Sequence, residues 1–266
     1  MVSSRSFIRA AVILATVIGA SKGSAQGAAA ASTSLPAAKD VIARYITSIG
    51  GKDALARVKS VRSTGVFEMP AAGLKGDVVV IQALPNKMVM NTTIPGVGDI
   101  NSGFNGEVAW SINPMQGARL LEGKELEQLR EESGFSSILR RAELTTSMET
   151  VGKGEMQGEA CYQVKVVYKS GREATECYSL GSGLLVGTTT KQTSPMGSVD
   201  VTTLVSDYKD VGGIKAALKT RLQMMGQEQV MTFSKIELDG ADDAKAFELP
   251  PAIKTMVEAK AKPKTE

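Results

Sequence analysis

Histidine is absent from the chain, and its absence limits the chemistry that the other side chains can perform. Without imidazole the chain lacks the side chain that most often serves as a general base. It can form no Ser-His or Cys-His nucleophile pair, and it lacks the usual zinc or copper ligands. Glycine pairs such as Gly50-Gly51 stand at turns and lack the spacing of a phosphate-binding loop. We therefore expect no enzyme activity, no cofactor and no metal.

Two groups of aspartates are the remaining candidates for chemistry. Asp239, Asp242 and Asp243 resemble part of a calcium loop, but the central Gly and the closing Glu are missing, so a solvated linker is expected. Asp207 and Asp210 stand at a strand end, where turn formation explains them better than acid–base work does. A hydrolase built only from carboxylates is the one enzyme class left open.

The two cysteines, Cys161 and Cys177, could form a disulfide. An even count in an exported chain favours the bond. A two-residue turn at Ser170-Gly171 would instead place the two sulfurs on opposite faces of a hairpin, whereas a bulge or a longer loop would reverse this. Both alternatives stay open.

The amino terminus has the pattern of a secretory signal peptide at 1–25. Arg5 and Arg9 precede a charge-free, largely apolar run at 10–20, and small residues follow at 23–25. Removing its three bases from the 31 of the chain leaves 28, which equals the 28 acids. An exported, formally neutral chain is expected, and nothing in this balance calls for nucleic acid.

The rest of the chain divides by composition and period. A flexible lead-in is expected at 26–36, one β domain at 37–257, and a disordered basic tail at 258–266. Helical spacing predicts two helices within 37–58, and two short amphipathic helices within 121–146. Period-two alternation predicts twelve short strands, which favours an antiparallel sheet. The predicted strands are 61–69, 76–83, 87–94, 100–104, 107–112, 150–156, 161–169, 173–180, 184–190, 198–208, 214–224 and 230–238.

Alternation in the first strands predicts one wet face and one dry face. The run 78–81 is apolar throughout and does not itself indicate a face. The helices at 121–146 would cover the dry face as a lid, through Leu126, Leu129, Ile138 and Leu139. The residues assigned to the dry face, as the wall of a hydrophobic cavity, are Phe67, Met69, Val79, Ile81, Met88, Met90, Val108, Trp110 and Ile112.

Two hypotheses explain the dry face. It is either an ordinary packed core, or the wall of a pocket for a lipophilic ligand around which the sheet curves. The many methionines on or beside strands support the pocket, because a flexible thioether adapts to varied ligands, although methionine also fills gaps in ordinary cores.

An ordered set of motifs resembles the bacterial outer-membrane lipoprotein-sorting proteins, relatives of the LolA-type lipoprotein carriers. Each motif alone is weak, but together they span nearly the whole mature chain. They are Tyr45 with GGKDAL at 50–55, VRSTG at 61–65, PNKM at 85–88, GFNGEVAW at 103–110, NP at 113–114, CYQV at 161–164, GLLV at 183–186, DYK at 207–209 and FELP at 247–250.

The resemblance implies a mainly β fold, with one curved antiparallel sheet of about 11–12 strands forming an unclosed barrel. Short helices would plug or cover its concave face. It implies a periplasmic, monomeric carrier of lipid or lipoprotein acyl chains, with membrane-bound donor and acceptor proteins as further partners. It also implies an arginine that latches the lid, for which Arg62, Arg119, Arg140 and Arg141 are available. The alternative is an envelope sensor or interaction module of the same fold without transport.

Overall fold

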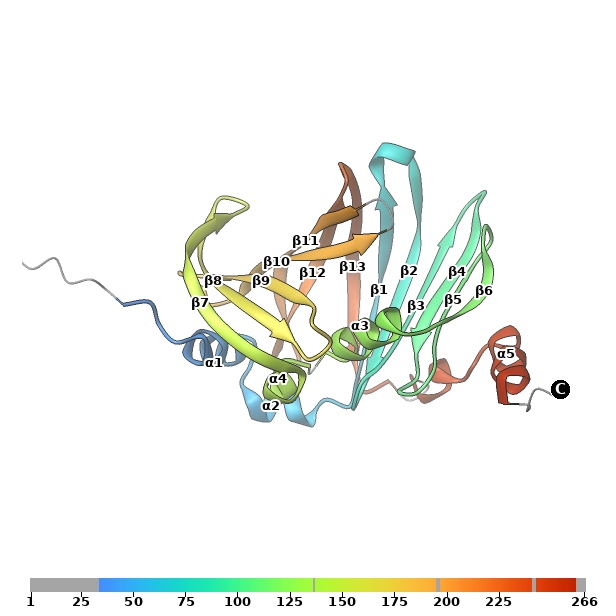
Figure 1. Cartoon of the computed structure of the whole chain (residues 1–266), viewed down its shortest axis with the longest axis horizontal. Helices are drawn as coiled ribbons and strands as arrows, with labels where there is room; N and C mark the ends of the chain where they lie inside the picture. Colours follow the sequence, from blue (N-terminus) through green and yellow to red (C-terminus); the bar gives the residue numbers. More distant parts are fainter. Residues whose placement is uncertain (1–33, 136, 195–196, 241–242, 262–266) are drawn as a thin grey trace, which may run out of the picture. The chain divides into compact units, whose positions relative to one another are not determined.

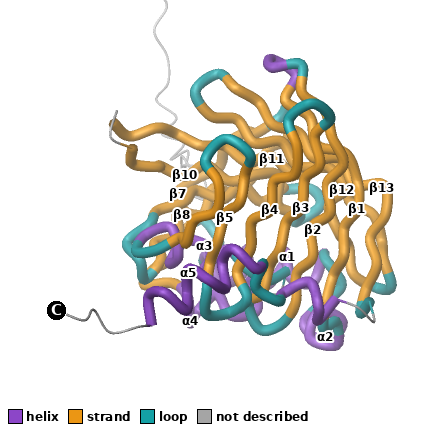
Figure 2. Tube along the Cα trace, turned by 90° about the vertical axis from the view of Figure 1, so that its right-hand side faces the viewer, coloured by secondary structure: helices purple, strands orange, loops and turns teal. Residues whose placement is uncertain are grey.

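A computed structural model describes residues 34–135, 137–194, 197–240 and 243–261. The predicted signal peptide at 1–25 lies outside the described residues, as does most of the lead-in predicted at 26–36. Two helices open the described part, α1 at Ala38–Ser48 and α2 at Lys52–Arg57, as the helical spacing within 37–58 predicts. Figure 2 shows the helices gathered at one end of the strands, apart from the short 3₁₀ helix η1 at Pro70–Ala72.

In the described part of the chain, thirteen antiparallel strands form one sheet that does not close into a barrel. The order is β6-β5-β4-β3-β2-β1-β13-β12-β11-β10-β9-β8-β7, so two meanders meet where the first strand pairs with the last. The strands are β1 Ser60–Met69, β2 Leu74–Ala83, β3 Lys87–Ile94, β4 Gly98–Phe104, β5 Ala109–Asn113, β6 Gly117–Leu121, β7 Thr145–Met156, β8 Glu159–Tyr168, β9 Glu173–Ser179, β10 Leu185–Ser194, β11 Gly197–Val211, β12 Ile214–Met224 and β13 Gln227–Leu238.

The fold class predicted from the sequence is confirmed, with one strand more than expected. The additional strand is β6, which is only five residues long and carries Arg119 between apolar neighbours, so its alternation is weak. The helices predicted within 121–146 are α3 at Lys124–Glu132, the 3₁₀ helix η2 at Ser137–Arg140 and α4 at Arg141–Leu144. We call the segment 124–144 the lid.

The predicted disordered tail at 258–266 is wrong for its first residues. Helix α5 runs over Pro251–Ala261, after the 3₁₀ helix η3 at Asp243–Phe247. Pro251 suits a helix start, and Ile253, Met256 and Val257 form an apolar stripe at helical spacing that packs on the sheet. Residues 262–266 lie outside the described part.

The strand register defines two faces of the sheet. Met88 pairs with Phe104, which pairs with Ala109, and Phe104 and Ala109 pack against Leu126 and Leu129 of α3. We call this side the lid face. Because successive side chains alternate, Trp110 points to the opposite side, which we call the outer face.

The predicted cavity wall is therefore split between the two faces. Phe67, Met69, Met88 and Met90 lie on the lid face by register. The other five lie on the outer face, in the cluster that η3 and α5 cover: Val79, Ile81, Val108, Trp110 and Ile112. The prediction that all nine residues share one face is wrong. Alternation shows which residues of one strand share a face, but the turns decide which face of the next strand matches it.

The outer-face cluster is a filled core. Trp110 is fully buried, and its indole nitrogen donates to Asn101 Oδ1. Ile81 and Val89 pack beside it, under Phe247 and Ile253 from the C-terminal segment. Figure 1 shows α5 beyond β6. This half of the predicted wall is packed against protein.

Candidate functional site

The lid has an apolar underside that contacts the sheet in two places. Leu126 and Leu129 of α3 pack on the cluster made of Phe104, Ala109 and Leu121, from β4, β5 and β6. Further along, Ile138 is buried and Leu139 half-buried in the largest cluster, which joins α1 and α2 to β7, β8 and β9. All four residues predicted for the lid thus lie in 124–144 and contact protein.

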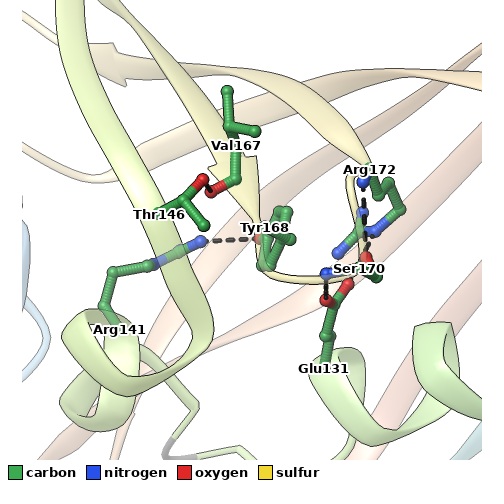
Figure 3. A network of polar contacts seen from close by, with 7 residues as sticks. All are labelled: Glu131, Arg141, Thr146, Val167, Tyr168, Ser170 and Arg172. Atoms are coloured by element: carbon green, nitrogen blue, oxygen red, sulfur yellow. Dashed lines mark hydrogen bonds and ion pairs between the residues drawn. The ribbon is translucent and has the colours of Figure 1, made fainter.

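A nearly buried ion pair holds the carboxyl end of α3 to the turn between β8 and β9. Glu131 Oε2 accepts from Arg172 Nε at 3.2 Å, and Glu131 Oε1 accepts from the backbone N–H of Ser170 at 3.2 Å. Arg172 also stacks over the Tyr168 ring, 3.9 Å from its centroid. Figure 3 shows Glu131 reaching up from α3 to this turn.

Helix α3 therefore bridges two distant parts of the sheet. A helix of nine residues is about 13 Å long, whereas β4 and β9 are eight positions apart in the sheet order, or roughly 40 Å along a flat sheet. One short helix can touch both only because the sheet curves toward it, so the lid lies on the concave side. Figure 1 shows α3 between the β4–β6 and β7–β9 halves.

A second polar contact holds α4 to the sheet. Arg141 Nη2 lies 2.9 Å from Glu176 Oε1. Arg141 Nη1 donates to the Tyr168 hydroxyl at 2.6 Å, as Figure 3 shows. The Tyr178 hydroxyl donates to the other Glu176 oxygen at 2.7 Å. Burial would lower the pKa of Arg141, but the Glu176 carboxylate, Tyr178 and Tyr168 together outweigh burial and hold that pKa above its ordinary value.

Of the four candidate arginines, Arg141 thus makes the nearly buried contact between the lid and the sheet. Arg119 of β6 also reaches the lid, through both oxygens of Glu125, but this pair is largely exposed and contributes little. Arg62 pairs in register with Ile81 and lies on the outer face. In the described part, Arg140 has two buried guanidinium nitrogens without a hydrogen-bond partner.

Helix α1 packs against the same buried group from the other side. The Tyr45 and Tyr178 rings lie 5.2 Å apart. Burial, together with the Glu176 carboxylate, raises the pKa of Tyr45 to about 12. The same two causes raise the pKa of Tyr178 well above its usual value. Both phenols are therefore neutral at any physiological pH, and the Arg141–Glu176 pair carries the charge here.

Beyond the lid, the lid face has apolar side chains that belong to none of the buried clusters of the described residues. Two of them, Val78 and Ile94, are buried, and eight others are half-buried on neighbouring strands from β12 through β3. We call the half-buried group the open apolar face: Leu222, Met231, Phe233, Phe67, Met69, Val80, Met88 and Met90.

Charge is excluded from the open apolar face by register. Every charged residue of β12, β13, β1, β2 and β3 falls on the outer face, as the pairs Lys75–Glu68 and Lys235–Glu237 illustrate. These residues are Lys215, Lys219, Arg221, Glu228, Lys235, Glu237, Arg62, Glu68, Lys75, Asp77 and Lys87. The side that faces the lid is thus uncharged across five strands.

The other candidate residues have structural roles. Cys161 and Cys177 form a disulfide, because the hairpin pairs Cys161 with Ser179 and so puts both sulfurs on one face. Asp239 accepts from the N–H groups of Lys59 and Ser60, and Asp210 accepts from Gly213 N–H in a turn. Asp242 lies outside the described residues, within which no three metal-binding side chains come together.

Comparison with known proteins supports the fold. No family model matches the sequence, and no curated protein matches it. A DUF1329 family protein from Desulfovibrio piger has TM-score 0.55 at 12% identity, over 79% of this chain and 97% of that one. A LolA superfamily protein from Nitrosomonas europaea has TM-score 0.54 at 12% identity, over 81% of this chain and 99% of that one. The chain thus has the LolA-like fold predicted from its motifs.

None of the helices in the described residues is both long enough and apolar enough to cross a membrane.

We predict that Glu131→Gln loosens the lid. Losing one partner leaves Arg172 nearly buried without its counter-charge, which should lower the free energy of unfolding by roughly 3 kcal/mol. Hydrogen exchange should accelerate over 124–144 before the rest of the sheet. Glu127→Gln, exposed on the same helix, is the control. Unchanged exchange in Glu131→Gln would show that the pair does not hold the lid.

We also predict that stability falls as the pH rises above about 10. The pKa of Tyr45 is about 12 in the native protein, against about 10 when unfolded. The native state therefore binds this proton more tightly, and the resulting stability is complete below pH 10 and lost as the pH passes 12. Urea unfolding from about pH 8 to about pH 11 should show a shallower decline for Tyr45→Phe. A decline as steep as that of the wild type would contradict the assignment.

Proposed function

We propose that this protein binds the acyl chains of lipids or lipoproteins on its open apolar face and carries them through the periplasm for outer-membrane lipoprotein sorting. The observation that carries the proposal is the uncharged lid face, where half-buried apolar side chains on five neighbouring strands lie outside the buried clusters. A plain core would have covered them, as α5 covers Trp110 on the outer face.

The composition of this face suits a flexible hydrocarbon. Four of its eight side chains are methionines, whose thioethers repack around ligands of different shape. Two phenylalanines, Phe67 of β1 and Phe233 of β13, add apolar contact area. An acyl chain would replace water against these groups without covalent chemistry.

The energies allow the lid to open for a ligand. Burying ten methylenes contributes roughly 8 kcal/mol, whereas releasing one nearly buried ion pair costs roughly 3 kcal/mol. One long chain therefore offsets the loss of both the Glu131–Arg172 and the Arg141–Glu176 contacts.

The LolA-like fold supports this function by analogy. Export to the periplasm rests on the signal-peptide pattern at 1–25. We propose membrane-bound donor and acceptor proteins as the further partners, and a monomer as the working form.

We expect a fluorescent acylglycerol to bind the wild type and to bind Met231→Asp at least ten-fold more weakly. The substitution puts a carboxylate on the open apolar face, where a bound chain would have to desolvate it. Thr232→Asp adds the same charge to the next residue of β13, exposed on the outer face, and should bind like the wild type. Circular dichroism establishes that both variants are folded.

Native mass spectrometry of protein purified from the periplasm should show co-purified lipid or lipoprotein. Consistently ligand-free protein that also fails to bind the fluorescent acylglycerol would overturn the proposal. A melting temperature that no lipid changes, with a protein partner recovered by cross-linking, would favour the envelope sensor or interaction module.

A further inference from the structure

Between β9 and β12 the lid face also carries hydroxyl groups: Thr188 of β10 lies there, as does Thr203 of β11, between Val201 and Val205. Thr188 of β10 pairs directly with Thr203 of β11. On its other side, Thr188 pairs with Glu176 of β9, whose carboxylate binds Arg141 of the lid. Since directly paired residues point to the same face, both threonine side chains lie on the lid face.

The two hydroxyls are available to a ligand. Thr188 and Thr203 are half-buried, and neither side chain makes a hydrogen bond within the described residues. On the outer face, by contrast, the neighbouring Thr189 and Thr202 pair with each other, with their hydroxyl oxygens 3.4 Å apart.

The threonine pair adjoins the open apolar face. Thr203 pairs with Leu222 of β12, which pairs with Gln229 of β13, and the next strand, β1, brings Met69 and Phe67. A molecule lying across these strands would meet hydroxyl groups at one end and hydrocarbon at the other. Such a surface matches an amphiphile in one orientation.

The charged residues beside the two threonines determine which polar group a ligand can place there. The Glu176 carboxylate is satisfied by Arg141 and by the Tyr178 hydroxyl, so this pair is neutral as a unit. A ligand anion next to Thr188 would face the Glu176 carboxylate, and a ligand cation would face Arg141. An uncharged acceptor, such as an ester carbonyl, meets neither repulsion and accepts from a threonine hydroxyl.

We propose that Thr188 and Thr203 form a polar subsite that binds the ester group of an acylated lipid, with the chains on the open apolar face. This subsite rests on the proposed function and specifies its ligand class as neutral esters. It also fixes the direction of the ligand, with its polar end beside the Arg141–Glu176 contact.

Two probes with the same pyrene-labelled chain test the subsite, one an acylglycerol ester and the other an alkane. Thr188→Val with Thr203→Val keeps the shape and removes both hydroxyls, so the ester should bind at least roughly ten-fold more weakly, and the alkane should bind as before. Thr189→Val with Thr202→Val makes the same change on the outer face and should alter neither affinity. Thr188→Ser with Thr203→Ser should restore ester binding.

The outcomes separate the subsite from the function. If the wild type binds both probes and the Thr188/Thr203 double variant weakens neither or weakens both equally, the subsite is refuted and the carrier function stands. Equal loss of ester binding in the outer-face variant also refutes the subsite. If the wild type binds neither probe, the carrier function itself fails. Thr203→Val alone replaces the double variant if melting curves show that the latter does not fold.

Discussion

Helix α3 is held at both of its ends by strands that are far apart in the sheet. Leu126 and Leu129 pack on β4, β5 and β6, while Glu131 binds Arg172 and the Ser170 backbone at the β8–β9 turn. One short helix can satisfy both contacts only against a curved sheet. Because of this curvature the sheet has a concave face, and the uncharged side chains of five strands lie on that face. The site thus depends on this bridge.

The apolar residues on the two faces of the sheet are covered to different extents. On the outer face, η3 and α5 cover a cluster in which Trp110 and Ile253 are fully buried, and a second buried cluster surrounds the Cys161–Cys177 disulfide. The lid face is closed at one end by α1, α2 and the lid, and beyond them Val78 and Ile94 are buried whereas the eight residues of the open apolar face are only half-buried. If these apolar residues formed only a core, we would expect other parts of the protein to cover them, as η3 and α5 cover Trp110 on the outer face. We infer that the open apolar face serves a ligand.

The sequence contains the elements but little of their mutual placement. Alternation predicted nearly every strand, and the lid helices were predicted from the spacing of Leu126, Leu129, Ile138 and Leu139. The alternation does not show the register between strands: Met88 of β3 and Trp110 of β5 both lie in alternating segments, yet Met88 lies on the lid face and Trp110 under α5. The disulfide depended on a one-residue difference in the β8–β9 hairpin, which no local pattern determines.

The residues that hold the lid were the hardest to predict. Arg141, Glu176, Arg172 and Glu131 are four charged residues among many, and their pairing depends on how α3 and α4 of the lid meet the β8–β9 turn and β9 in the fold. The resemblance to lipoprotein carriers indicated that an arginine should latch the lid, without indicating which. One local signal existed: Glu176 alternates with Ala174 and Tyr178 on the buried side of β9, and a carboxylate at such a position requires a partner.

Quenching by a lipid with brominated acyl chains tests the central claim most directly, because bromine quenches tryptophan only near contact. Trp110 is the single tryptophan and lies on the outer face, while position 90 lies on the open apolar face. The account predicts that saturating brominated lipid leaves wild-type emission unchanged and strongly quenches Met90→Trp in a Trp110→Phe background. Quenching of Trp110, with none at position 90, would place the acyl chains on the outer face and contradict the account.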